Sequence, residues 1–277
     1  MSPARDFNFD EIGYWSEIKL EIVRKYAQAY STILSKQHLH HVYVDAFAGA
    51  GVNVARSTGE FIPGSPLNAL LIDPPFKEFF LIDMDAGKAA NLRQLTGNRR
   101  NVYIYEGDCN EILIGQVFPK IRYEDYRRGL CLLDPYGLHL KWEVIHTAGQ
   151  MNSLEIFLNF PVADMNRNVF WRDASRVSPE QAKRLTAFWG DETWKQAGYS
   201  GEGDLFGHEE KQPNYVIAKA FQQRLRSAAN FKHVPDPMPM RNSRGAIVYY
   251  LFFASPHPVA GRIVTDIFNS YRNKGIR

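Results

Sequence analysis

Cysteine and long apolar runs are both scarce in this chain of 277 residues. Its two cysteines, Cys109 and Cys131, have no neighbours at metal-ligand spacing, so the sequence predicts neither a disulfide framework nor a bound metal. No apolar stretch approaches the roughly 18 residues that a membrane-spanning helix needs, and the opening MSPARDFNFDEIGYW shows no signal segment. We therefore expect a cytoplasmic protein without a membrane partner.

Charge of one sign is also not concentrated anywhere in the chain. Lys and Arg number 33 against 30 Asp and Glu, which gives a net charge of +3 without a long block of either sign. This mild excess permits a nucleic-acid partner and does not require one. With 45% hydrophobic and 23% charged residues, the composition is that of an ordinary globular protein.

What the sequence does contain is a series of short apolar runs separated by helical patterns. A first helix is predicted over Tyr14–Lys36, where apolar residues recur every three or four positions. The predicted strands after it are His41–Phe47, Glu78–Ile82, Asn101–Tyr105, Leu130–Leu133 and Leu154–Phe160. Strands that alternate with helices in this way predict an α/β fold with a parallel, Rossmann-like sheet.

Beyond residue 161 the alternation stops. Residues 162–213 predict an inserted helical subdomain or lid, which interrupts the Rossmann domain begun in residues 1–161. Residues 214–277 are expected to complete that domain with a helix, an antiparallel hairpin and a last helix. The hairpin turn is predicted at Asn242–Gly245, and such a hairpin at the end of a parallel sheet distinguishes this plan from a plain dehydrogenase fold.

Glycines follow the first predicted strand where it ends in an acid. That strand ends over Asp45 to Phe47, and Gly49 and Gly51 follow it. Glycine allows the backbone to approach a ligand where a Cβ would clash, although an ordinary tight turn has the same pattern. Residues 52–64 then have loop composition, and we expect them either to close over a ligand or to make a surface excursion.

Acids also end three of the later strands, at Asp83, Asp108 and Asp134. The carboxyl ends of parallel strands line the ligand crevice, so these acids and Asp45 are expected along one rim. Asp83 is placed to accept both hydroxyls of a ribose, and Asp108 to accept from the amino group of an adenine. The competing interpretation is that each acid is a helix cap, which is what we expect of Asp85.

Two neighbours of these acids complete the predicted nucleoside site. Met84 would pack on the adenine face, and the backbone N–H of Cys109 would donate to the ring. The glycines lack the third member of the phosphate-binding fingerprint, because Val52, Asn53 and Val54 follow Gly51. A cofactor without phosphates therefore fits better, and S-adenosylmethionine is the predicted one.

The tetrapeptide Asp134-Pro135-Tyr136-Gly137 has the composition of a catalytic motif. The Asp134 carboxylate and the Pro135 carbonyl can accept from both N–H groups of an aryl amine, which keeps the nitrogen lone pair directed out of the ring. Tyr136 can stack on a base that has left its helix or loop. The alternative interpretation is a simple turn after a strand, since both dipeptides are common in turns.

With these residues in view, the chain resembles class I S-adenosylmethionine-dependent methyltransferases, and more narrowly the three-Cys-motif partner (TcmP) family. The resemblance implies cofactor contacts from the FAGAG turn, which begins at Phe47, and a separate partner protein that carries the cysteines. D-P-Y-G is similar to the D-P-P-Y of adenine and cytosine amino-methyltransferases and to the D-P-F-G of tRNA guanosine-N2 dimethyltransferases, so the base stays open. The resemblance is carried by Tyr14-Trp15, Lys19, Phe47–Gly51, Gly64–Leu67, Phe80–Asp83, Asp134–Gly137 and Tyr249–Leu251.

The sequence therefore predicts a methyltransferase that acts on an exocyclic amine of a base in RNA or DNA. Its predicted catalytic residues are Asp134, Pro135 and Tyr136. Two alternatives remain open at this point. One is a methyltransferase of the same fold that acts on a small molecule or a protein, and the other is a non-catalytic cofactor-binding subunit that serves the partner protein.

Overall fold

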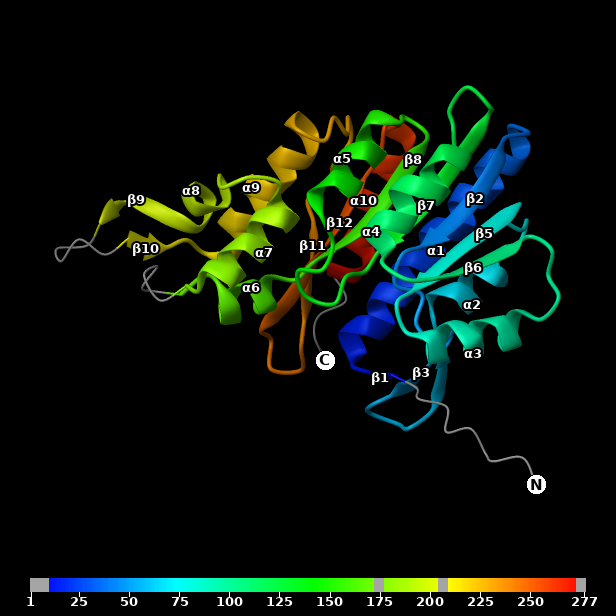
Figure 1. Ribbon diagram of the computed structural model, residues 1–277, viewed down its shortest axis with the longest axis horizontal. Coiled ribbons are helices and arrows are strands. Elements are labelled where there is room, and N and C mark those ends of the chain that lie inside the picture. The colour runs from blue at the N-terminus through cyan, green and yellow to red at the C-terminus, as the bar shows by residue number, and fades with distance from the viewer. Residues whose placement is uncertain (1–9, 172–176, 204–208, 273–277) are drawn as a thin grey trace. The chain divides into compact units, whose positions relative to one another are not determined.

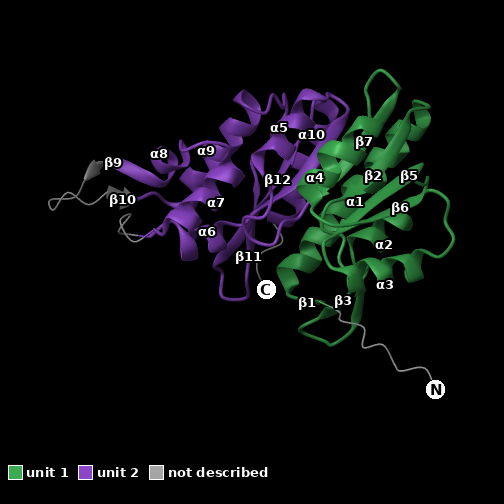
Figure 2. Cartoon of the chain, in the orientation of Figure 1, with its two compact units in different colours: residues 1–132 green, residues 133–277 purple. Residues whose placement is uncertain are grey.

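The computed structural model describes residues 10–171, 177–203 and 209–272. The chain divides into two compact units, residues 1–132 (unit 1) and residues 133–277 (unit 2), which Figure 2 colours green and purple. The sequence predicts domain boundaries at other positions, after residues 161 and 213, and these boundaries stay predictions.

Helices and strands alternate along unit 1 (Figure 1). In chain order its elements are β1 (Asp10–Ile12), α1 (Tyr14–Lys36), β2 (His40–Asp45), β3 (Val52–Ala55), β4 (Phe61–Pro63), α2 (Ser65–Leu70), β5 (Glu78–Asp83), α3 (Ala86–Thr96), β6 (Val102–Glu106), α4 (Cys109–Ile112), a π-helical turn (Leu113–Val117), a 3-10 turn (Phe118–Lys120) and β7 (Arg127–Leu133).

The main sheet of unit 1 is parallel, and β2 is central in it. β2 pairs with β5 on one side and with β7 on the other, and β5 pairs with β6 in turn (Figure 1). The chain thus builds outward from β2 to β6 and then returns to the opposite side of β2. Such a reversal leaves a crevice at the carboxyl ends of the strands, which is where open α/β sheets bind ligands.

Residues 52–64 contain two short strands, so the prediction of a loop throughout this stretch is wrong. β3 pairs antiparallel with β4, and β1 pairs parallel with β3, so that a second small sheet forms next to the glycine turn. Gly59 makes the hairpin turn with a φ of +72°. The loop composition of this stretch concealed a hairpin because its pairing with β1 joins residues that are distant in the sequence.

Unit 2 has its own set of elements, of which α5 and β8 come first. They are α5 (Trp142–Gln150), β8 (Leu154–Phe160), α6 (Val162–Asn168), α7 (Pro179–Trp189), α8 (Trp194–Gly198), β9 (Tyr199–Gly203), β10 (Glu209–Lys211), α9 (Asn214–Ser227), β11 (Met238–Arg241), β12 (Ile247–Ala254) and α10 (Pro258–Arg272). Residues 162–213 thus contain α6, α7 and α8, and also the short antiparallel pair β9–β10.

In unit 2, β12 lies between β8 and β11 and runs antiparallel to both. The predicted hairpin is therefore confirmed, with its turn at Asn242–Gly245, where Gly245 N donates to Asn242 O over 2.9 Å. An aromatic cluster joins β8 and β12 to helices α7 and α9, because Phe221 lies 4.7 Å from Phe160 and 5.6 Å from both Phe188 and Phe252, ring centre to ring centre.

These elements confirm the predicted fold class. Parallel strands alternate with helices, an N-terminal helix precedes them, and an antiparallel hairpin follows. In the part of the chain that the structure describes, no helix is both long and apolar enough to cross a membrane.

A glycine in helix α5 gives a test of the packing in unit 2. A Cβ added to Gly149 would lie 1.8 Å from the carbonyl oxygen of Ala229. Alanine is worth about 1 kcal/mol more than glycine inside a helix, yet we expect Gly149→Ala to lower the free energy of unfolding by about 2 kcal/mol because of this overlap. Chemical denaturation measures the change.

The matched control for this substitution is Gly115→Ala. Gly115 is helical and exposed, and a Cβ added there would meet nothing within 4 Å. We expect this control to be neutral or slightly stabilising. If Gly149→Ala stabilises the protein as much as the control does, the close approach of α5 to Ala229 is wrong.

Candidate functional site

The glycine turn after β2 is joined to the end of β5. Gly49 has a φ of +65°, and its N–H donates to Asp83 Oδ2 over 2.8 Å. The same two segments are also joined one residue earlier, where Ala48 N donates to Ile82 O over 2.9 Å. Two of the predicted site residues, Gly49 and Asp83, are thus in direct contact at the carboxyl ends of neighbouring parallel strands.

The two glycines of the turn have different surroundings. A Cβ added to Gly51 would lie 3.0 Å from Leu95 Cδ1 and 3.1 Å from Leu92 Cδ2, both in helix α3. At Gly49 the nearest described atom would be Asp10 Oδ2, at 3.9 Å. Gly51 thus has a reason within the fold to be glycine, since its φ is +85° and leucines of α3 lie beside it, whereas a Cβ at Gly49 would make only an ordinary contact. Cofactor contacts of both glycines stay predictions.

Asp83 retains capacity to accept further hydrogen bonds. Its Oδ2 accepts from Gly49 N, and its Oδ1 accepts from Asp85 N over 2.9 Å. Each carboxylate oxygen has two acceptor sites, so one on each oxygen is left for a ligand hydroxyl. Met84, the next residue, is 69% exposed, which places an uncovered thioether beside this carboxylate.

The residues that follow Asp83 have structural roles. Asp85 caps helix α3, as predicted, since its side chain accepts from Lys88 N over 3.0 Å. Lys88 was not predicted as a site residue. Its ammonium donates to Asp10 Oδ2 over 2.6 Å, and although burial opposes its charge, Asp10, Asp83 and Asp85 together raise its pKa. No local pattern links Asp10 to Lys88, so this fixed cation was not detectable in the sequence.

Asp108 and Cys109 lie where β6 passes into helix α4. Asp108 Oδ1 accepts from Asn110 N over 2.8 Å and from Asn110 Nδ2 over 2.7 Å, so the helix-cap interpretation holds for this oxygen. Asp108 Oδ2 has no hydrogen-bond partner among the described residues. The cap thus leaves one oxygen of Asp108 to accept from a ligand amine.

Asp45 differs from the other acids in being fully buried. Its Oδ1 accepts from Phe47 N over 3.3 Å, and its Oδ2 accepts from the Tyr43 hydroxyl over 3.3 Å. Burial, followed by the Asp45 charge, holds the pKa of Tyr43 well above its usual value. In the structure Asp45 shapes the turn that contains Phe47, and direct contact of either residue with a cofactor stays a prediction.

The two cysteines are buried and free. Burial, followed by the Asp108 charge and more weakly by Asp83, raises the pKa of Cys109 to about 12. Burial and the Asp45 carboxylate hold the pKa of Cys131 well above its ordinary value. Asp83 and Asp108 thus act on Cys109, whereas Asp45 acts on Cys131.

This environment predicts cysteines that do not react in the folded protein. With a pKa of about 12, about one Cys109 thiol in ten thousand is ionised near pH 8, and the thiolate is the form that iodoacetamide attacks. We expect no alkylation of the native protein under conditions that fully label both cysteines in guanidinium chloride. Mass spectrometry of the labelled peptides provides the readout, and rapid labelling of native Cys109 would contradict the burial.

The predicted catalytic residues open unit 2. Asp134 follows the last residue of β7 and is half-buried, Pro135 is buried, and the ring of Tyr136 is 91% exposed. Gly137 has a φ of +65°, and a Cβ added there would lie 3.1 Å from Asp164 Oδ2 of helix α6. The motif therefore combines a half-buried carboxylate with a tyrosine that its own unit leaves uncovered.

Sequence reasoning did not identify three acceptor side chains of unit 2. Asn159 Oδ1, Asp164 Oδ2 and Asn166 Oδ1 are buried and have no hydrogen-bond partner among the described residues. Asn159 lies near the end of β8 and the other two lie in α6. The sequence signal for Asn159 is a polar residue near the end of an otherwise apolar strand, directly before Phe160 and Pro161.

Electrostatics and geometry together favour an organic ligand in unit 1. In the described part of the chain, no three His, Cys, Asp or Glu side chains come together in a way that holds a metal ion. The retained acceptors of Asp83 and Asp108 and the uncovered Met84 instead fit a ribose and a purine. The residues present therefore fit an adenosyl group.

Comparison with known proteins gives structural neighbours only. No protein-family model matches the chain, and no curated protein matches it in sequence. Protein LPL1258 from Legionella pneumophila, described by the family model DUF519, is 13% identical with a TM-score of 0.56, and the match covers 94% of this chain and 91% of that one. At this identity the likeness shows a shared fold.

Two further structures are more distant. A candidate methyltransferase from Thermobifida fusca is 12% identical with a TM-score of 0.43, over 87% of this chain and 81% of that chain. The N-methyltransferase NodS from Bradyrhizobium japonicum is 11% identical with a TM-score of 0.35, over 85% and 97%. Neither match carries an argument about this chain. Membership of the three-Cys-motif partner family stays a prediction.

Proposed function

We propose that the protein is an S-adenosylmethionine-dependent methyltransferase that methylates an exocyclic amine of a nucleobase in RNA or DNA. The observation that carries this proposal is the contact between Gly49 N and Asp83 Oδ2 beside the central strand of a parallel sheet. An acid that fixes a glycine turn and still offers acceptors is suited to a ribose, and the turn lacks the glycines that a pyrophosphate requires.

In this proposal unit 1 holds the adenosyl group. Asp83 accepts from the ribose hydroxyls, Asp108 Oδ2 accepts from the adenine amino group, and Met84 covers one face of the ring. The N–H of Cys109 donates to a ring nitrogen. When bound, S-adenosylmethionine supplies an electrophilic methyl group, and no ionisable residue of unit 1 is required to react with it.

The substrate residues in this proposal are Asp134, Pro135 and Tyr136. Asp134 and the Pro135 carbonyl accept from the two N–H groups of the amine, which favours the geometry in which the nitrogen lone pair is available. Tyr136, 91% exposed, stacks on the base. A base must leave its stack before these groups can reach the amine, and an exposed ring compensates for the stacking that is lost.

The test is incubation of the protein with labelled S-adenosylmethionine and total cellular RNA or DNA, followed by nucleoside analysis. We expect label on an N-methylated nucleoside, and we expect the Michaelis constant for the polymer to rise steeply with salt because of counterion release. Label on protein or on small molecules alone would contradict the nucleobase assignment. Cofactor binding without transfer to any acceptor, with or without a three-Cys-motif partner protein, would contradict catalysis.

A further inference from the structure

A groove in unit 2 carries cationic and aromatic side chains. It encloses about 420 Å³ between helix α9, the β11–β12 hairpin and the end of α10. The lining residues include three cations, Lys219, Arg241 and Arg272, and one acid, Asp236, so the net charge of the lining is +2. Its aromatic lining residues are Tyr215, which is 63% exposed, and Tyr250.

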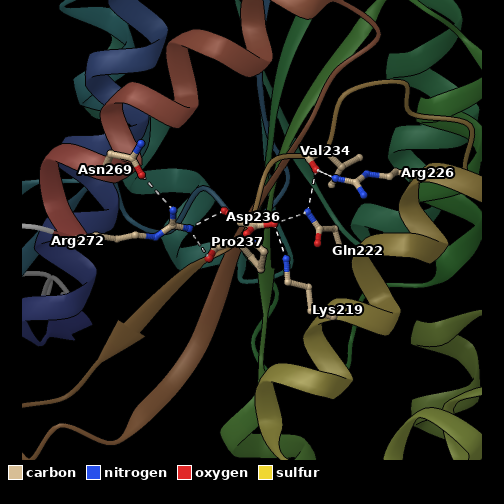
Figure 3. A network of polar contacts seen from close by, with 8 residues as sticks. All are labelled: Lys219, Gln222, Arg226, Val234, Asp236, Pro237, Asn269 and Arg272. Atoms are coloured by element: carbon tan, nitrogen blue, oxygen red, sulfur yellow. Dashed lines mark hydrogen bonds and ion pairs between the residues drawn. The ribbon is translucent and has the colours of Figure 1, made fainter.

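The wall of the groove at Asp236 and Pro237 is held from two helices (Figure 3). Arg272 of α10 donates to Asp236 O over 2.7 Å and to Pro237 O over 2.8 Å. From α9, Lys219 pairs with the Asp236 carboxylate and Gln222 donates to Val234 O over 2.8 Å. The groove is therefore formed before any ligand enters it, which reduces the ordering cost of binding.

Tyr250 adds a polar atom to the groove lining. The residue is 5% exposed, and its hydroxyl makes no hydrogen bond to the described residues. The hydroxyl is not one of the buried polar atoms that lack a partner, so it is open to the groove and can donate to a ligand there. Burial raises the pKa of this hydroxyl, and the charge of the exposed Arg241 acts against that rise, so the hydroxyl stays a neutral donor near neutral pH.

The groove is connected to the Asp134–Gly137 turn within unit 2 through helix α6. Asp164 of α6 lies against Gly137, 3.1 Å from the Cβ position of that glycine. Two residues further along the helix, Asn166 Nδ2 donates to Asn214 Oδ1 over 3.0 Å, and Asn214 lines the groove. One short helix thus contacts both the predicted catalytic turn and the groove.

We propose that this groove binds a single-stranded segment of the nucleic-acid substrate. Arg241 contacts a phosphate, the Tyr250 hydroxyl donates to a phosphate oxygen, and Tyr215 stacks on a base. Cations interleaved with aromatic rings are typical of surfaces that bind single strands, because every base has a face that stacks and every nucleotide carries a charge. The inference rests on the proposed function, which it extends to the position of the flanking strand.

The experiment is fluorescence anisotropy with labelled oligouridine and oligothymidine about twelve nucleotides long, a length within the range of single-strand sites. It is carried out without cofactor, so that methyl transfer is not needed for the signal. We expect Tyr215→Ala to weaken binding about tenfold and Tyr215→Phe to retain it, because phenylalanine also stacks. Arg241→Ala should weaken binding and reduce the slope of log affinity against log salt by about 0.7.

The control is Arg122→Ala, which removes the same charge from an exposed residue outside the groove and is expected to leave the affinity unchanged. Wild-type affinity in both Tyr215→Ala and Arg241→Ala would overturn the proposal. A polyglutamate peptide bound as tightly as the oligonucleotides, with the same losses in the variants, would also overturn it and indicate an acidic protein segment.

Methylation assays separate this proposal from the proposed function. If Arg241→Ala raises the Michaelis constant for the polymer and leaves kcat unchanged, both proposals are supported. If methyl transfer occurs with an unchanged Michaelis constant, the groove proposal fails and the proposed function stands. If oligonucleotides bind through the groove and no polymer is methylated, the proposed function fails and the groove remains a binding site.

Discussion

Replacing Asp134 with asparagine is expected to lower kcat for methyl transfer about a hundredfold or more, the usual cost of removing one preorganised group that acts in the transition state. Asparagine keeps the size of the side chain and loses the charge that makes the carboxylate a strong acceptor. Because Asp134 is predicted to contact only the amine, the dissociation constant for S-adenosylmethionine should stay within about twofold. Transfer of labelled methyl to the polymer and calorimetry of cofactor binding measure the two quantities.

The design separates a catalytic Asp134 from one that only forms the turn. Asp125→Asn serves as the control, because Asp125 is an exposed acid whose ion-pair partner is Arg122. If Asp134 only stabilises the turn before Gly137, the asparagine variant will keep its kcat and show a lower thermal midpoint. Unchanged kcat therefore removes Asp134 from the proposed mechanism, whatever happens to stability.

The second large effect is expected at Asp83. Asp83→Ala removes the acceptor of both Gly49 N and Asp85 N, at 2.8 and 2.9 Å, together with the two acceptor sites predicted for the ribose. Charge-assisted hydrogen bonds of this kind contribute about twice as much as neutral ones. We expect the affinity for S-adenosylmethionine and for S-adenosylhomocysteine to fall about a hundredfold.

The neighbouring Asp85 supplies the matched control. Its side chain accepts from Lys88 N and caps α3, so Asp85→Ala should cost about 1 kcal/mol of stability with little change in cofactor affinity. The two substitutions are two positions apart in the same turn. A lower cofactor affinity in Asp83→Ala than in Asp85→Ala therefore reports on the Asp83 carboxylate. If both variants bind the cofactor equally well, the ribose assignment of Asp83 is wrong.

Much of the fold was predictable because its signals are local. Helix α1 occupies Tyr14–Lys36 and strand β8 occupies Leu154–Phe160, the ranges that the sequence predicts. Apolar periodicity depends only on neighbours a few residues apart, and it is readable wherever an element has one buried face or is wholly buried. The positions of Asp83 and Asp108 at strand ends followed from the same patterns.

What the local patterns left out depends on contacts between distant parts of the chain. The strands β3 and β4 were missed because β1 completes their sheet, and Lys88 was missed because its partner is Asp10. The close packing of Gly51 against Leu92 and Leu95 of α3 was not predicted either. In each case the deciding neighbour is dozens of residues away, beyond the reach of periodicity.

The sequence by itself determined the alternation of strands and helices, the acids at the strand ends and the composition of the Asp134–Gly137 turn. Only the tertiary structure decided which of those acids keep an acceptor for a ligand, as Asp83 does, and which is buried, as Asp45 is. It alone also joined α9, β11, β12 and α10 into one groove. The physical reason is that a side chain's hydrogen bonds and exposure depend on what packs against it, and packing partners come from the whole fold.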